Sequence, residues 1–213
     1  MDNMLQFMKL IGQLKRVPRT GWVYRNVKQP ESVSDHMYRM SMMALTIEDR
    51  NLNKDRCMKL ALVHDMAECI VGDIAPADNI SKPEKHRREK EAMEHLTGLL
   101  SDGLRKEIYD LWNEYETQSS PEAKLVKELD QLEMILQAHE YEQLEGTPGR
   151  LEDFFTSTRG RFHHPEVLRL VESLNDERAR HMGKGEAGQP AAAAAAATQE
   201  KTDTSTNTPS SSS

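Results

Sequence analysis

Apolar side chains recur at helical spacing along most of the chain. Met40, Met43 and Ile47 follow His36 at four, seven and eleven positions, which places all of them on one helical face. No segment shows sustained alternation of apolar and polar residues, so the pattern indicates no strand. Helices are predicted at residues 5–14, 32–47, 56–71, 83–100, 104–115, 121–136 and 165–174. The second of them opens with Ser32-Val33-Ser34-Asp35, which resembles a capping box. The chain is therefore predicted to be all-α.

Two segments interrupt this pattern. Residues 15–30 contain Pro18 and Pro30 together with several cations and aromatic rings, and this composition indicates a loop. Residues 183–213 hold no large apolar side chain, so burial could not offset the cost of ordering them. We expect one helical domain at 1–182 and a disordered tail at 183–213.

An adjacent His-Asp pair lies inside the most apolar of the predicted helices. His64 and Asp65 are followed one turn later by Glu68, in a run that the apolar pattern buries. A buried imidazole or carboxylate is costly unless it is paired, and a cation is a usual partner. His36 and Asp130, each on another helix with apolar neighbours, fit the same site.

These side chains form a donor set for a divalent cation. Two imidazoles and two carboxylates suit Mn, Fe, Co, Ni, Zn or Mg better than Cu(I) or Ca. Glu68 follows His64 by four positions and shares its helical face, so it is the candidate to orient or deprotonate a water molecule. Asp73 is placed to assist Glu68 or to hold a second cation. Taken singly, His36 or His64 would more often be a hydrogen-bonded core residue, and Glu68 and Asp73 would more often be solvated. The joint pattern favours a metal site.

Five short motifs follow one another along the chain: Tyr24-Arg25-Asn26-Val27, Glu31-Ser32-Val33-Ser34-Asp35-His36, His64-Asp65-Met66-Ala67-Glu68, Gly72-Asp73-Ile74 and Leu125-Val126-Lys127-Glu128-Leu129-Asp130. In this order they resemble the HD-domain 5′-deoxynucleotidases, a branch of the metal-dependent phosphohydrolases. The similarity covers about residues 5–180, and the motifs are specific as a set.

The resemblance implies a compact helical HD domain, often a homodimer, that removes phosphate from deoxyribonucleoside 5′-monophosphates. By position it implies four metal ligands: His36, His64, Asp65 and Asp130. Glu68 and Asp73 match the acidic pair beside the metal. In eukaryotic members this pair, with the main-chain carbonyl of Ile74, is able to hold a second cation.

Substrate contacts are implied by the same resemblance. In that family an arginine and a tryptophan before the first histidine contact the phosphate and the sugar. Arg19 and Trp22 correspond to them here, with two residues in between; the alternative for Trp22 is a loop anchor on the core. Lys82 could also meet the phosphate or remain an exposed lysine. The stretch 85–90 is expected to be a solvated face from which one cation could turn toward the site.

Charge and composition limit the classes of binding partner that this protein could have. The formal net charge is −7, whereas a broad surface for nucleic acid or anionic membrane needs a Lys/Arg excess. A small-molecule nucleotide remains compatible, because a few local cations suffice for one phosphate. No apolar run reaches the roughly 20 residues of a membrane span, and residues 1–17 lack the apolar core of a secretory signal. We expect a soluble cytoplasmic protein, with the nucleus left open, whose two cysteines, Cys57 and Cys69, are unpaired core residues.

Two other functions fit the same motifs. Another HD-type enzyme would cleave phosphodiesters or nucleoside triphosphates, and a substrate panel separates these reactions. A non-catalytic module would bind nucleotides around a structural metal, but such a scaffold has no need of Glu68 and Asp73. The predicted function is therefore hydrolysis of deoxyribonucleoside 5′-monophosphates to deoxyribonucleosides and phosphate, with a divalent cation (Mn, Co, Fe, Mg or Zn) as cofactor.

Overall fold

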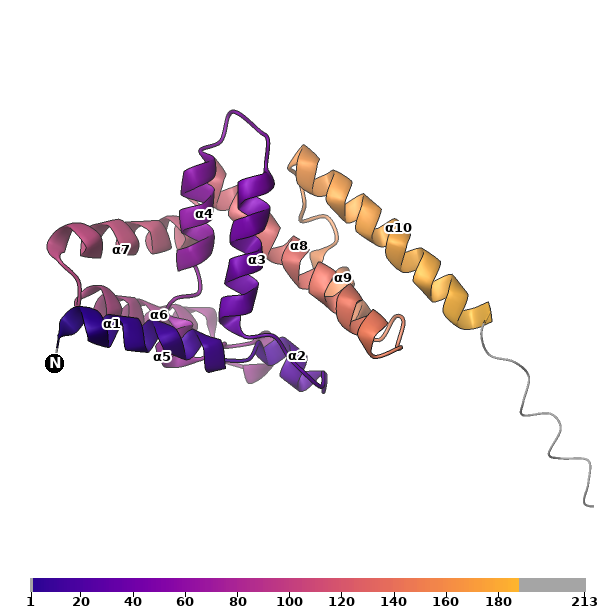
Figure 1. The fold of residues 1–213 in the computed structure, drawn as a ribbon, viewed down its shortest axis with the longest axis horizontal. Helices are drawn as coiled ribbons and strands as arrows, with labels where there is room; N and C mark the ends of the chain where they lie inside the picture. The colour runs from indigo at the N-terminus through magenta and orange to yellow at the C-terminus, as the bar shows by residue number, and fades with distance from the viewer. Residues whose placement is uncertain (1, 188–213) are drawn as a thin grey trace, which may run out of the picture.

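The described part of the chain, residues 2–187 of a computed structural model, is helical and contains no strand (Figure 1). An isolated bridge joins Pro18 to Ser32. The α-helices are α1 (Asn3–Ile11), α2 (Thr20–Tyr24), α3 (Val33–Thr46), α4 (Lys54–Val63), α5 (Glu68–Val71), α6 (Lys82–Thr97), α7 (Asp102–Thr117), α8 (Pro121–Leu144), α9 (Glu152–Thr158) and α10 (Pro165–Ala187), and short 3₁₀ turns lie at Gly12–Arg16 (η1) and Pro76–Asp78 (η2). The all-α prediction is confirmed.

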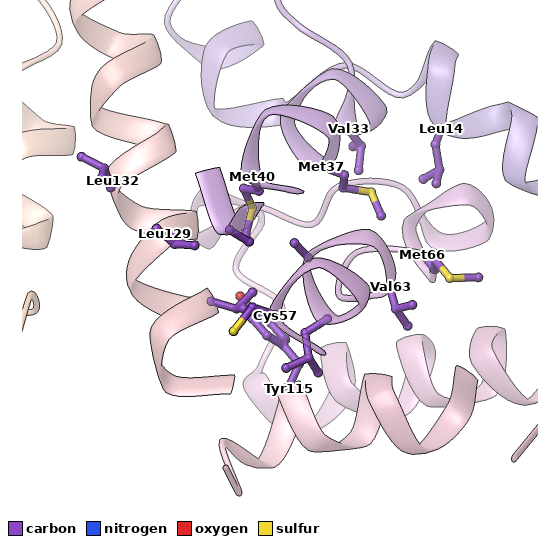
Figure 2. Close-up of a cluster of buried hydrophobic side chains, with 14 of the residues drawn as sticks. Leu14, Val33, Met37, Met40, Cys57, Val63, Met66, Tyr115, Leu129 and Leu132 are labelled. Atoms are coloured by element: carbon purple, nitrogen blue, oxygen red, sulfur yellow. The ribbon is translucent and has the colours of Figure 1, made fainter. Parts of the chain in front are cut away.

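The centre of the fold is the junction of α3, α4 and α8. α3 packs along α4, both contact α8, and α7 packs against α4 and α8, while α10 runs beside α8 (Figure 1). Figure 2 shows Met40 of α3 and Leu129 of α8 among the buried side chains there, with Cys57 of α4 and Tyr115 of α7. Met40 and Leu129 are fully buried, so the helices that carry the chemical motifs are held by a close-packed core.

Polar caps fix where the central helices begin. The Ser32 hydroxyl accepts a hydrogen bond from the Asp35 main-chain N–H, and the Ser32 main-chain N–H donates to the Asp35 carboxylate, which forms the predicted capping box of α3. The Asn53 side chain caps α4 by accepting from the main-chain N–H of Arg56, and the Ser120 side chain caps α8 by accepting from that of Ala123. Because Ser32 starts α3, His36 lies in the first turn of that helix and at the level of the neighbouring His-Asp pair.

The prediction of a single helix at 56–71 is wrong in the middle of that range. α4 ends at Val63, the four residues 64–67 form turns, and α5 begins at Glu68. Within this break the main chain uses tighter bonds three residues apart, such as the N–H of Met66 to the carbonyl of Val63 at 3.1 Å. The break falls on the His-Asp pair. The directions of its two side chains are therefore set by a turn and not by a regular helix.

Three further differences concern short or terminal elements. α2 lies within the predicted loop 15–30, and α9 occupies a stretch with no predicted helix. α10 continues to Ala187, so residues 183–187, predicted as part of the tail, are helical; residues 188–213 lie outside the described part. The domain boundary at residue 182 therefore stays a prediction. No helix among the described residues is long and apolar enough to cross a membrane.

Candidate metal centre and active site

His36 enters the site from the first turn of α3. Its side chain is fully buried, and its Nδ1 lies 2.5 Å from Oε2 of Glu133 on α8. Glu133 is held in turn by Arg39, whose Nε donates to Oε1 at 2.8 Å. Because the Glu133 carboxylate accepts the proton on Nδ1, Nε2 is the nitrogen of His36 that faces the centre. Burial and Arg19 would lower the pKa of His36, but Asp130 and Glu133 outweigh them and raise it to about 9, so a metal ion would replace a proton on Nε2. That Nε2 is buried and has no hydrogen-bond partner in the described part of the chain.

His64 presents the same nitrogen from the end of α4. Its Nδ1 lies 2.9 Å from the main-chain oxygen of Ala61, so Nδ1–H donates and Nε2 carries the lone pair. The side chain is almost fully buried, and its Nε2, too, has no hydrogen-bond partner among the described residues. The two imidazole rings stand edge to face at 5.5 Å. The Nε2 atoms of two buried imidazoles thus face the same centre.

Asp65 and Asp130 complete the cluster. Asp65 Oδ2 lies 3.1 Å from His64 Nε2 and 3.9 Å from His36 Nε2. Asp130 Oδ1 lies 3.3 Å from His36 Nε2. On its other side, Asp130 Oδ2 accepts hydrogen bonds from the Tyr115 hydroxyl at 2.9 Å and from Lys127 Nζ at 2.8 Å. The structure therefore brings together the four residues predicted as ligands.

The negative charges of Asp65 and Asp130 at the centre favour the binding of a cation. Burial would raise the pKa of Asp65, but the adjacent His64 and the Arg19 guanidinium outweigh it and hold that pKa well below its usual range. Burial would likewise raise the pKa of Asp130, yet Lys127 and His36 lower it. Two carboxylates and two imidazole Nε2 atoms form a borderline-hard donor set. The residues present therefore fit a divalent cation.

The acidic pair lies beside this cluster. Glu68 is 3% exposed, and its Oε2 has no hydrogen-bond partner in the described part of the chain. Burial first, and then the charges of Asp65 and Asp73, raise the pKa of the Glu68 carboxyl well above its usual value. Asp73 follows Gly72, whose φ of 76° turns the chain sharply after α5. The main-chain oxygen of Ile74 accepts a hydrogen bond from Lys85 Nζ at 3.3 Å.

Arg19 reaches the site, and the acidic pair helps to place it. Its Nη1 lies 3.3 Å from Asp65 Oδ2. The next residue, Thr20, donates its main-chain N–H to Asp73 Oδ2 at 2.7 Å and its hydroxyl to the Asp73 carbonyl at 2.6 Å. Burial would lower the pKa of Arg19, but Asp65 and Asp73 raise it, so the guanidinium stays charged.

Trp22 and Lys82 do not point to the metal cluster. Trp22 is 2% exposed, its ring packs against Tyr141 and Phe154, and its indole N–H donates to Glu31 at 2.9 Å. This placement fits the loop-anchor alternative for Trp22. Lys82 is exposed at the first position of α6, and no hydrogen bond or ion pair joins it to the site residues that the structure describes. Both substrate contacts stay predictions.

Four supporting residues were missed from the sequence: Tyr115, Lys127 and Glu133, which hold the ligands, and Lys85 on the acidic side. Lys127 precedes Asp130 by three positions on a helix, a spacing that could have indicated their contact. Lys85 belongs to the stretch 85–90, from which one cation was expected to turn inward. Tyr115 and Glu133 carry no local signal, because their contacts depend on how the helices pack.

Comparisons with family models and with known proteins agree on one family. The HD domain model matches residues 11–167. The 5′-deoxynucleotidase HDDC2 of Danio rerio is 83% identical over 87% of this chain and 92% of its own length. The human protein of the same name is 70% identical over 84% of this chain and 88% of its own length.

A solved structure supports the fold. The PH0347 protein of Pyrococcus horikoshii OT3 is 28% identical, covers 83% of this chain and 99% of its own, and superimposes with a TM-score of 0.64. The family model spans more than half of this chain, and the relatives are similar over nearly their full length. The chain belongs to the HD-domain family.

Proposed function

We propose that this HD-domain enzyme is a 5′-deoxynucleotidase, which hydrolyses deoxyribonucleoside 5′-monophosphates to deoxyribonucleosides and phosphate. One observation carries the proposal: Nε2 of His36 and Nε2 of His64, both buried and without a hydrogen-bond partner in the described chain, converge with Asp65 and Asp130. The names of the relatives supply the substrate class.

His36, His64, Asp65 and Asp130 would hold a divalent cation. Such a cation would neutralise phosphate charge and make a neighbouring water molecule more acidic. Mn, Co, Fe, Mg and Zn all accept this mixture of nitrogen and oxygen donors, and in proteins their selection depends on geometry and availability.

Glu68 accepts the proton in the hydrolytic step. Its Oε2 is buried and unpartnered in the described structure, and burial together with Asp65 and Asp73 raises the pKa of this carboxyl, which favours its taking up a proton. Water attacks phosphorus, one of its protons passes to Glu68 Oε2, and the bond from phosphorus to the 5′ oxygen breaks. A proton then passes to the departing 5′ oxygen, so that the products are the nucleoside and inorganic phosphate.

Arg19 binds the phosphate. Its guanidinium is near the metal cluster, about one-sixth exposed, and remains charged because of Asp65 and Asp73. The planar fork of an arginine matches two phosphate oxygens. Asp73 positions this residue through its two hydrogen bonds with Thr20, and this link gives Asp73 a role even when no second cation is bound.

Phosphate release from paired ribo- and deoxyribonucleoside 5′-monophosphates tests the function. Protein stripped with a chelator should regain activity on addition of single metals and favour the deoxy substrate. Cyclic and triphosphate substrates belong in the same panel. Cleavage of those alone would replace the proposal with another HD-type reaction.

Two substitutions test the assigned roles. Asp65→Ala should lose both the metal and hydrolysis, whereas Glu68→Ala should keep the metal at the first site and lose turnover. Lys90→Met, at an exposed position on α6, is a suitable control. Equal activity in Asp65→Ala, Glu68→Ala and the parent would reject the assignment.

The same enzyme is proposed to be a homodimer. An apolar groove lies where α1, η1, α3 and α4 meet, lined mainly by Phe7, Ile11, Leu14, Met37, Tyr38, Leu62, Val63, Met66 and Ile108. Tyr38 and Leu62 are 66% and 52% exposed, which leaves large apolar area facing water. Light scattering on the parent and on Tyr38→Asp should give a dimer and a monomer; a monomeric parent would contradict this part.

A further inference from the structure

The two carboxylate oxygens of Asp130 have different partners. Oδ1 faces the metal cluster and lies 3.3 Å from Nε2 of His36. Oδ2 accepts hydrogen bonds from the Tyr115 hydroxyl at 2.9 Å and from Lys127 Nζ at 2.8 Å. The carboxylate is therefore held in one orientation, with a single oxygen directed at the cluster.

The directions of these hydrogen bonds follow from the groups involved. Lys127 Nζ also lies 3.1 Å from the Tyr115 hydroxyl oxygen. An ammonium group can only donate, and a tyrosine hydroxyl has one proton to give. The Tyr115 oxygen therefore accepts from Lys127 and donates its own proton to Asp130. A carboxylate oxygen offers about two lone pairs, so both lone pairs of Oδ2 are used.

Packing between α7 and α8 fixes this arrangement. Tyr115 of α7 is buried, and its ring lies 4.9 Å from the ring of His64, so one side chain contacts two of the proposed ligands. Lys127 precedes Asp130 by three positions on α8, and its Nζ lies 5.4 Å from the centre of the Tyr115 ring. The orientation of Asp130 thus depends on both helices.

The number of oxygens that Asp130 gives to a cation matters for catalysis. A carboxylate can bind a divalent ion with one oxygen or with both. If Asp130 used both oxygens, the protein would fill one more position around the ion, and that position would be lost to water or to a phosphate oxygen. Because Oδ2 is already engaged by two donors, Oδ1 is the oxygen that remains for the ion.

We propose that Tyr115 and Lys127 are positioning residues that restrict Asp130 to one metal-binding oxygen and so keep a position on the metal open for water or phosphate. This inference rests on the proposed function, because an open position matters only if the bound metal receives the reacting groups. Neither residue needs to touch the substrate in this role. Both act through the Oδ2 atom of Asp130.

The number of water molecules on bound Mn²⁺ tests the proposal. Electron spin echo spectroscopy in heavy water counts them on the full-length protein, loaded with less Mn²⁺ than protein. Tyr115→Phe combined with Lys127→Met frees Oδ2, so the bound ion should carry about one water molecule fewer than in the parent. Phosphate release at saturating metal should fall about 10–100-fold. Lys127→Arg retains a charged donor and should keep the water count of the parent.

Matched controls make the same changes elsewhere on α7 and α8. Tyr109→Phe and Lys124→Met alter residues that form no hydrogen bond with Asp130 in the described structure, and both should behave as the parent does. If the double variant melts early, Tyr115→Phe alone keeps the buried ring and should shift the water count in the same direction.

An unchanged water count in the folded variants would overturn the proposal. So would a raised KM in Lys127→Met with the water count kept, which would make Lys127 a substrate-binding residue. If the parent hydrolyses no monophosphate, the proposed function fails, while the water count still decides what Tyr115 and Lys127 do to Asp130.

Discussion

Two clusters of two histidines and one carboxylate occur in the described structure, and they differ in what holds the imidazoles. The first cluster is His36, His64 and Asp65 at the centre; the second is His139 of α8 with Glu177 and His181 of α10. In each, one donor atom from every residue lies within 4.8 Å of the others. Residue types and distances alone therefore do not separate the two clusters.

The proton positions do separate them. In the first cluster both Nδ1 atoms have oxygen acceptors, Glu133 and the Ala61 carbonyl, so both Nε2 atoms are free to bind a metal. In the second, His139 Nε2 lies 3.3 Å from Glu177 Oε1, and its buried Nδ1 has no partner in the described chain.

A metal on His139 Nε2 would force the proton onto Nδ1, where a buried N–H would have no acceptor. His139 is better served by donating from Nε2 to Glu177, an ordinary hydrogen bond that joins α8 to α10. The comparison teaches that a metal site is recognised by the groups that fix its ligands as much as by the ligands.

The largest expected contrast is in activity. His64→Ala removes a proposed ligand and should lower phosphate release by about a thousandfold or more, because the cation supplies several kcal/mol of charge stabilisation. His181→Ala, the matched change in the second cluster, should leave the rate within about twofold. Similar losses in both variants, measured at saturating metal and with melting temperatures recorded, would mean that the two clusters do not differ as described.

A smaller effect should come from a residue that touches no metal. Glu133→Gln replaces the carboxylate that accepts the His36 Nδ1 proton. Loss of such a support costs about 10–100-fold in metal affinity. Competition with a chromophoric chelator measures this change, and Gln143→Ala beside the second cluster is the control. An unaltered affinity in Glu133→Gln would show that His36 is not oriented by Glu133.

The smallest effect concerns pH and the carboxylates near each cluster. Burial and the neighbouring Glu133 raise the pKa of Glu31 to about 7. Because this folded value exceeds the unfolded one of about 4.3, Glu31 contributes stability that is full below about pH 4.3 and is lost as pH rises through about 7. Glu31→Gln should therefore reduce the loss of unfolding free energy between about pH 5 and pH 8 by roughly 1–2 kcal/mol.

Glu177 gives the matched control. The hydrogen bond from His139 lowers the pKa of Glu177, so its contribution is lost only in more acidic solution. Urea unfolding of Glu177→Gln should keep the pH dependence of the parent between about pH 5 and pH 8. If Glu31→Gln also kept the parent's pH dependence of stability, the environment of Glu31 would be more hydrated than its burial indicates.

The sequence predicted the parts of the fold that depend on local spacing. The apolar face that begins at His36 placed α3 correctly, and its capping box set the start of that helix. The break at His64 was missed because the apolar run continues through it, and only the tertiary contacts of the His-Asp pair favour a turn there. α2 and α9 are too short to produce a periodic signal.

The candidate site shows the same division. Its ligands could be predicted because they lie in recognisable motifs, as His64 and Asp65 do. Glu133 and Tyr115 could not, since their contacts with His36 and Asp130 join residues from different helices. The second cluster was missed for the same reason: Glu177 lies 38 positions beyond His139.

Anomalous diffraction from crystals grown with Mn²⁺ or Co²⁺ tests the central claim most directly. The account predicts one strong peak within bonding distance, about 2.0–2.3 Å, of Nε2 of both His36 and His64 and of oxygens of Asp65 and Asp130. A peak at His139 and His181 with none at His36 and His64 would contradict it.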